Sequence, residues 1–131
     1  LALEDEVVLY ADWSREDAEK KARKLLKKDI TAVFCMADRM AGGVYDVLNG
    51  QGRHAGADLS VMGFDNQDMA AYFLPGLTTM ALPLHEMGER AARLMTHRLK
   101  TQAAGFDLSS DETTIRIPCH LVERDSVRDI S

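Results

Sequence analysis

Aromatic or acidic side chains follow three apolar segments of the sequence, and these residues are the best candidates for chemistry. Asp12 and Trp13 follow the first segment, Ala37 and Asp38 the second, and Asp65 the third. An indole offers a flat apolar face with one N–H donor, and a carboxylate can accept hydrogen bonds from two hydroxyl groups at once. Together these groups suit a sugar, and the indole alone would also suit a nucleobase.

Each of these side chains also has a structural explanation. Trp13 could pack as a hydrophobic staple in front of a helix that Ser14 caps. For Asp38, the N-cap of the next helix is a better explanation than a ligand contact. Asp65 could equally be a turn residue or a site residue, and its neighbours in the sequence do not decide between the two.

The apolar segments predict the strands that position these residues. Short, continuous apolar runs are typical of strands that are covered on both faces. Strands are expected at 6–10, 31–36, 60–64, 77–82, 113–118 and 120–127. Apolar residues at helical spacing predict helices after Ser14, after Asp38 and over 84–100. This alternation implies right-handed crossovers and an α/β three-layer sandwich with a mostly parallel sheet. Ligands bind such sheets beyond the carboxyl ends of the strands, where the candidate residues would meet.

Two glycines, Gly42 and Gly43, fall inside the second expected helix. Each costs roughly 1 kcal/mol relative to alanine in a helix interior. The expected compensation is the close approach of another backbone, either within the fold or across a dimer.

Composition limits the classes of protein to consider. The 131 residues make one domain's worth of chain, and the net charge of −5 argues against direct binding to nucleic acid. No apolar run approaches the roughly 20 residues of a membrane span. Cys35 and Cys119 fit a reducing compartment, so a cytoplasmic location is expected. Because the chain begins at Leu1 and not at Met, we expect that part of the natural protein precedes it.

Signals for enzyme chemistry are weak. There is no glycine-rich phosphate loop, and four histidines stand singly, away from metal-ligand spacing: His54, His85, His97 and His120. A phosphoryl-accepting Asp65 would need further acids and a lysine around it, and no lysine is well placed. We therefore expect no enzyme activity, no metal and no cofactor.

An ordered set of motifs resembles the LacI/GalR-type sugar-responsive repressors. The motifs are ITAVFC at 30–35 with ADRMA at 37–41, SVMGFDN at 60–66, PGLTT at 75–79, MG at 87–88 with AA at 91–92, and LVER at 121–124. The likeness spans nearly the whole chain, and GFDN followed by PGLTT is its most specific part.

The resemblance implies a C-terminal part of an effector module shaped like a periplasmic sugar-binding protein. Residues 1–82 would form the C-terminal effector-binding subdomain. Residues 83–111 would be a helix and loop that cross to an N-terminal subdomain, and residues 112–131 the return strands. Without that subdomain, the helix at 84–100 is expected to dock on a neighbouring chain or on its own sheet.

The resemblance also assigns residues to an effector site. Trp13 and Asp65 would contact the effector. Asp38 keeps an acid of the family, for which the N-cap role is still preferred. Ala37 stands where the family usually has asparagine, so one polar contact would be lost and the identity of the sugar is open.

Four residues would belong to the family's dimer surface: Gly42, Gly43, Phe73 and Leu77. The implied function is a homodimeric repressor in which a small effector, a sugar by preference, changes the operator affinity of a helix-turn-helix absent from this sequence. The alternative is a periplasmic sugar-binding protein that serves a transporter, and a signal peptide upstream would favour it.

Overall fold

The structure is a computed structural model, and it describes residues 7–103 and 114–129. The chain divides into two compact units. Unit 1 comprises Leu1–Ala81 with Leu121–Ser131, and unit 2 comprises Leu82–His120.

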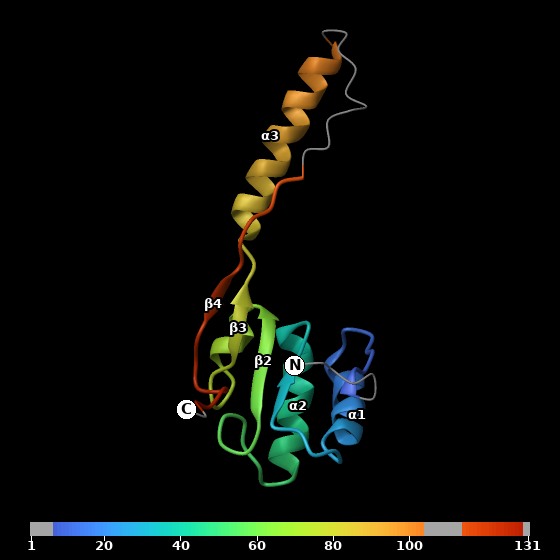
Figure 1. The fold of residues 1–131 in the computed structure, drawn as a ribbon, viewed down its shortest axis with the longest axis vertical. Coiled ribbons are helices and arrows are strands. Elements are labelled where there is room, and N and C mark those ends of the chain that lie inside the picture. Colours follow the sequence, from blue (N-terminus) through green and yellow to red (C-terminus); the bar gives the residue numbers. More distant parts are fainter. Residues whose placement is uncertain (1–6, 104–113, 130–131) are drawn as a thin grey trace. The chain divides into compact units, whose positions relative to one another are not determined.

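A four-stranded sheet forms the frame of unit 1 (Figure 1). Its strands are β1 (Ala32–Phe34), β2 (Ser60–Asp65), β3 (Thr78–Ala81) and β4 (His120–Val122), and their spatial order follows the sequence. β1, β2 and β3 are parallel: Phe34 lies opposite Met62, which lies opposite Thr78. Parallel pairing of successive strands confirms the predicted α/β class.

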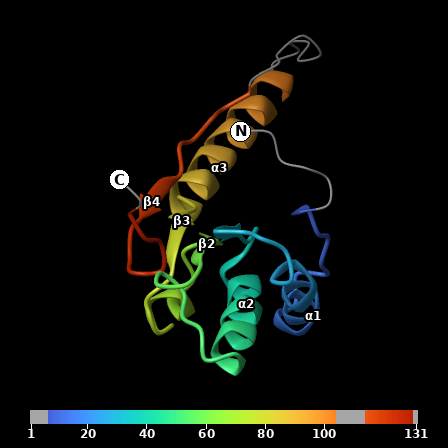
Figure 2. The same ribbon diagram turned by 60° about the horizontal axis from the view of Figure 1, so that its bottom comes forward.

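Two helices follow from the expected start and stop signals. α1 (Arg15–Leu25) begins where the Ser14 side chain accepts a hydrogen bond from the Asp17 amide at 3.0 Å, which confirms the predicted N-cap. α2 (Asp38–Gly50) ends just before Gly52, which has a φ of +67°. α2 packs against β2, and α1 packs against α2 (Figure 2). A short 3-10 helix, η2 (Asp68–Ala71), links β2 to β3.

The core lies between α2 and the sheet. Val47 and Leu48 of α2 are buried against Leu59, Val61 and Leu77. Leu77 is 0% exposed within this chain, so its own side chain presents no surface, and its place in a dimer interface stays a prediction.

Gly43 is explained by contacts within the chain. A Cβ at Gly43 would collide with the backbone carbonyl of Arg15 and the amide of Glu19 in α1. A Cβ at Gly42 would press on the Phe73 ring and the Arg15 side chain at 3.2–3.3 Å. The expected close approach of another backbone is therefore that of α1 at Gly43, whereas Gly42 meets only side chains, and neither contact requires a dimer.

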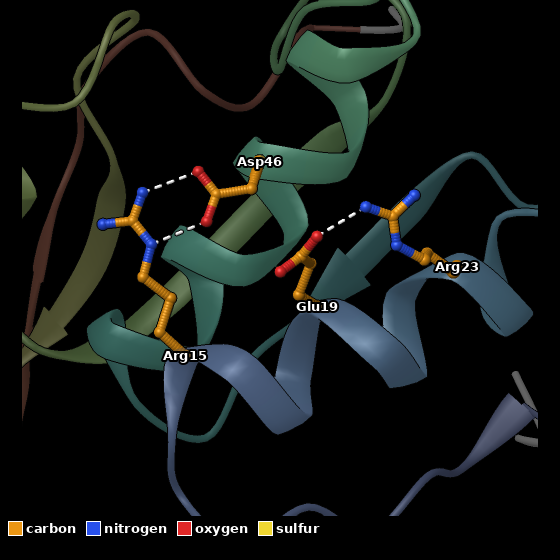
Figure 3. Close-up of polar contacts among 4 residues, drawn as sticks. All are labelled: Arg15, Glu19, Arg23 and Asp46. Carbon is orange, nitrogen blue, oxygen red and sulfur yellow. Dashed lines mark hydrogen bonds and ion pairs between the residues drawn. The ribbon is translucent and has the colours of Figure 1, made fainter.

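A bidentate ion pair joins the two helices at this contact (Figure 3). Arg15 Nε and Nη2 donate to the Asp46 carboxylate at 2.7 and 2.6 Å. These bonds lower the pKa of Asp46 and raise that of Arg15. Figure 3 also shows a second pair, Glu19–Arg23, which runs along α1 itself at 2.5 Å.

Two predicted strands do not form. Of the strand predicted at 6–10, residue 6 lies outside the described residues and residues 7–10 are in no strand. β1 pairs only with β2, and no described segment bonds to its other side. Residues 114–118 have no regular structure, and residue 113 lies outside the described residues. β4 is shorter than the predicted strand at 120–127. Beyond it, the Arg124 amide donates to the Thr78 hydroxyl and the Ser126 hydroxyl donates to the Val61 carbonyl, so these bonds replace a backbone ladder.

Unit 2 contains α3 (Leu84–Ala103), which confirms the start of the third predicted helix. Apolar residues along it are exposed, namely Leu84, Met87, Met95 and Leu99. The docking of this helix on another chain or on the sheet stays a prediction. Neither α3 nor any other described helix combines the length and apolar character that crossing a membrane requires.

The contact at Gly43 predicts opposite effects for two substitutions in α2. Gly43→Ala should lower the free energy of unfolding by about 1–3 kcal/mol, because the added methyl group forces α1 away from α2. Gly50→Ala is the matched control, since no atom lies within 4 Å of its added Cβ. It should raise the free energy of unfolding by up to about 1 kcal/mol. Urea denaturation measures both, and equal effects would contradict the proposed packing.

Candidate functional site

The candidate site residues gather at the carboxyl ends of the parallel strands. α2 begins with Asp38, four positions after β1 ends at Phe34. Asp65 is the last residue of β2 and lies opposite Ala81, the last residue of β3. The sheet therefore brings Asp38 and Asp65 to the carboxyl ends of its strands, as the polarity of the strands predicted.

Asp38 is fully buried and connects three segments. One carboxylate oxygen accepts a hydrogen bond from Thr79 Oγ1 at 2.6 Å, and the other accepts one from the Gln67 amide at 2.7 Å. Gly63 of β2 leaves the space that this carboxylate fills, since a Cβ there would collide with it.

These contacts correct the predicted role of Asp38 as an N-cap. Ala37 occupies the N-cap position of α2 and forms no side-chain cap. Asp38 is the first residue of the helix, where a negative charge is favourable, but its carboxylate faces the sheet. Ala37 is only 6% exposed, so its role as an effector contact stays a prediction that the geometry does little to support.

Burial raises the pKa of Asp38, and the hydrogen bonds from Thr79 and Gln67 oppose that shift. A raised pKa means that the folded protein binds a proton more tightly than the unfolded chain does. The contribution of this group to stability is therefore greatest below about pH 4, the ordinary range of Asp. It falls as the pH rises through the folded-state pKa.

The turn that follows β2 has an unusual backbone. Asp65 and Asn66 have φ values of +108° and +54°. Such conformations cost about 1–3 kcal/mol each and persist only where the surrounding contacts impose them. Here Arg124 Nη2 donates to Asn66 Oδ1 at 3.0 Å, and the Gln67 amide is bound to Asp38. Asp65 is therefore a turn residue by its backbone, while its partly exposed carboxylate accepts a hydrogen bond from Gln67 Nε2 at 3.2 Å.

Trp13 sits in a second constrained turn, directly before α1. The Asp12 carboxylate accepts hydrogen bonds from the Ser14 amide at 2.9 Å and the Ser14 hydroxyl at 2.5 Å. These bonds lower the pKa of Asp12, and Trp13 between them has a φ of +68°. Its side chain is 61% exposed, so it is not a buried staple and its face is open to a ligand.

The helix contact places Trp13 at the same end of the unit as the acids. Arg15, two positions after Trp13, contacts Gly43 through its carbonyl. Gly43 lies five positions, or about one and a half helical turns, after Asp38 in α2, so Trp13 is near the start of that helix. Within residues 7–103 and 114–129, no hydrogen bond joins Trp13 to Asp38 or Asp65, which are themselves linked through Gln67.

Two residues near the C-terminal end support the site and were missed in the sequence. Arg124 donates to the Leu77 carbonyl at 2.6 Å as well as to Asn66. Ser126 is fully buried, donates to the Val61 carbonyl at 2.6 Å and accepts from the Thr78 amide at 2.8 Å. The LVER motif contains Arg124, but nothing in its spacing indicates a partner 58 residues away.

The sheet is mostly parallel, and an exposed indole and a constrained carboxylate lie at the carboxyl ends of its strands. This is the architecture of a ligand-binding domain. The chain belongs to the periplasmic binding protein-like domain family, whose model matches residues 2–127. This family membership confirms the predicted fold.

The relatives of the chain are transcriptional regulators of the LacI family. It is 32% identical over 133 residues to the HTH-type transcriptional repressor PurR of Vibrio cholerae serotype O1, covering 100% of this chain and 38% of that protein. A LacI family regulator of Enterococcus faecalis V583 with bound ribose is 29% identical, with a TM-score of 0.80 over 94% of this chain and 44% of that one. The regulator CelR in complex with cellobiose is 26% identical, with a TM-score of 0.83 over 96% of this chain and 37% of that one.

These relatives confirm the resemblance to LacI-type repressors and do not favour a transport protein. The chain spans 38% of the length of the PurR relative, so it corresponds to only part of such a regulator.

Removing the Asp38 carboxylate should destabilise the contacts between α2, β3 and the loop after β2. Asp38→Ala leaves the Thr79 hydroxyl and the Gln67 amide without their acceptor, and should lower the free energy of unfolding by about 2–4 kcal/mol. Asp38→Asn keeps the shape and one acceptor, and should cost less.

The two variants also distinguish the effect of the Asp38 charge on stability from the effect of its shape. In urea denaturation from pH 4 to pH 7, the advantage of the natural protein over Asp38→Asn should shrink as the pH rises, because only Asp38 carries the raised pKa. Equal losses for the Ala and Asn variants, with no dependence on pH, would contradict this account of the network.

Proposed function

We propose that this chain is the effector-binding part of a cytoplasmic bacterial transcriptional regulator, and that its effector is a small sugar. The observation that carries the proposal is the turn at Asp65. Its backbone is kept in a costly conformation by a buried network, while its carboxylate stays accessible at the ligand-binding edge of the sheet.

The chemistry of the proposed contacts matches a sugar. The Asp65 carboxylate can accept hydrogen bonds from two neighbouring hydroxyls, and the exposed Trp13 face can cover the C–H face of a pyranose or furanose ring. Asp38 would position the turn without touching the effector. Ala37 would add only a methyl group. Sugar-bound relatives, with ribose and with cellobiose, support this choice of ligand class.

Regulation would follow from linkage between the effector and DNA. An effector that prefers one arrangement of two subdomains changes operator affinity by the difference in its own binding free energy. A coupling of ~1–3 kcal/mol would give a useful response. In this proposal residues 83–111 cross to a second subdomain, and operator DNA is bound only through a helix-turn-helix outside these residues.

A homodimer is part of the proposal, through a surface around η2. Phe73 stacks on Tyr45 with ring centroids 4.9 Å apart, and it is flanked by Tyr72 and Leu74, which are 83% and 85% exposed. Exposed large apolar side chains next to a partly buried ring are typical of an interface. Gly42 lies beneath the Phe73 ring and would shape this surface only indirectly.

A thermal-shift screen of the full-length protein against mono-, di- and phosphorylated sugars, and against free nucleobases, tests the proposal. A sugar at about 100 times its dissociation constant should add ~2.7 kcal/mol to the free energy of unfolding. Asp65→Asn and Trp13→Ala should each abolish most of that gain. The first replaces one of two charged acceptor oxygens with an NH₂ donor, and the second removes the stacking face.

Asp29→Asn is the matched control for loss of a carboxylate. Asp29 is exposed and lies before β1, at the amino ends of the strands and away from the proposed site. The sugar should therefore stabilise this variant as it does the natural protein. A response to nucleobases alone would contradict the sugar assignment. A sugar response that survives both site variants would contradict the site.

A further inference from the structure

The side chain of Arg124 connects the turn after β2 to the start of β3. Its Nη2 donates to Asn66 Oδ1 at 3.0 Å, and its Nη1 donates to the Leu77 carbonyl at 2.6 Å. The aliphatic stem lies over Gly76, where an added Cβ would be 3.1 Å from Arg124 Cδ. The guanidinium is therefore bonded through two different nitrogens, while its stem packs against the chain.

The backbone of Arg124 is itself fixed to the sheet. The Arg124 amide donates to the Thr78 hydroxyl at 2.9 Å, and that hydroxyl donates to the Arg124 carbonyl at 3.0 Å. Two positions further on, the buried Ser126 hydroxyl donates to the Val61 carbonyl and accepts from the Thr78 amide. The side chain that reaches the turn thus starts from a backbone that is held on β2 and β3.

The turn that Arg124 reaches needs such support. Asp65 and Asn66 have φ values of +108° and +54°, which non-glycine residues keep only where neighbouring contacts impose them. The Asn66 amide also donates to Thr79 Oγ1, at a longer distance of 3.4 Å. A hydrogen bond from a charged donor is roughly twice as strong as a neutral one. The bond from Arg124 is therefore the stronger of these two restraints on Asn66.

We propose that Arg124 is a positioning residue of the effector site: by holding Asn66 it keeps the neighbouring Asp65 carboxylate in one position, and it thereby sets effector affinity without touching the effector. The inference rests on the effector site proposed above. A carboxylate that is fixed in advance loses less conformational freedom when a ligand binds, which favours binding. Without the bond from Arg124, the turn would relax and the effector would bind more weakly to a chain that is still folded.

This role requires arginine and not only a positive charge. Two nitrogens of one planar guanidinium reach Asn66 Oδ1 and the Leu77 carbonyl at the same time. A lysine carries a single ammonium on a flexible stem and cannot reproduce this fork. Effector affinity should therefore fall in Arg124→Lys, although the charge of the side chain is unchanged.

Isothermal titration calorimetry of the full-length protein with ribose and with cellobiose tests the inference. For a sugar that binds, Arg124→Lys should raise the dissociation constant about tenfold, because a supporting contact of the site is lost. Arg128→Lys is the matched control. Arg128 is exposed and donates to the Ala57 carbonyl at 3.2 Å, before the amino end of β2. The dissociation constant of this variant should stay close to that of the natural protein.

A second variant, Asn66→Gly, distinguishes the bond to the turn from the bond to Leu77. Glycine adopts a positive φ without strain, but it has no side-chain acceptor for Arg124. In the Asn66→Gly protein, Arg124→Lys should weaken sugar binding no further, because the bond that it breaks is already absent. An equal loss of affinity with and without Asn66→Gly would overturn the proposal and would assign Arg124 a structural role through Leu77 alone.

Backbone amide NMR relaxation without any sugar separates this inference from the proposed function. The Asp65 and Asn66 amides should have order parameters of about 0.85 in the natural protein and in Arg128→Lys, and below about 0.6 in Arg124→Lys. Order parameters that stay high in Arg124→Lys would overturn the inference, whether or not a sugar binds. A loss of order in Arg124→Lys together with no binding of ribose or cellobiose would contradict the sugar assignment and support the positioning of the turn by Arg124.

Discussion

The buried carboxylate of Asp38 is the constraint on which the edge of this sheet depends. A carboxylate removed from water is costly unless donors surround it, and Asp38 finds them on β3 and on the loop after β2. Its position also requires glycine at Gly63. One side chain thereby fixes the relative positions of α2, β2 and β3 at the end where a ligand would bind.

That network, together with the separate turn held by Asp12, keeps the side chains at this end of the sheet in fixed positions. In the described ranges, three non-glycine residues have a positive φ: Trp13, Asp65 and Asn66. All three belong to turns at the proposed effector site. The Asp12 carboxylate accepts a hydrogen bond from the Ser14 amide in one turn, and Arg124 donates to Asn66 in the other. Strained residues gather at functional sites, because a site must present its groups in one geometry. The strain and the proposed function therefore point to the same residues.

The sequence predicted those features that depend on residues close together in the chain. The Ser14 cap, the end of α2 near Gly52 and the parallel direction of β1, β2 and β3 follow from neighbouring residues and crossover rules. The role of Asp38 could not be predicted in this way, because its donors lie 29 and 41 positions away in the sequence. The same holds for Ser126 and Arg124. Residues 7–10 read as a strand, but a strand forms only when a second backbone lies beside it.

The central claim is that a sugar binds at the edge fixed by Asp38. An NMR titration of the full-length protein with ribose, cellobiose and lactose tests it most directly, by following backbone amides and the Trp13 indole N–H. The account predicts saturable shifts centred on Trp13, Asp65, Asn66 and Gln67, with little change at the amino ends of the strands. Saturable binding that leaves these four residues unshifted would contradict it.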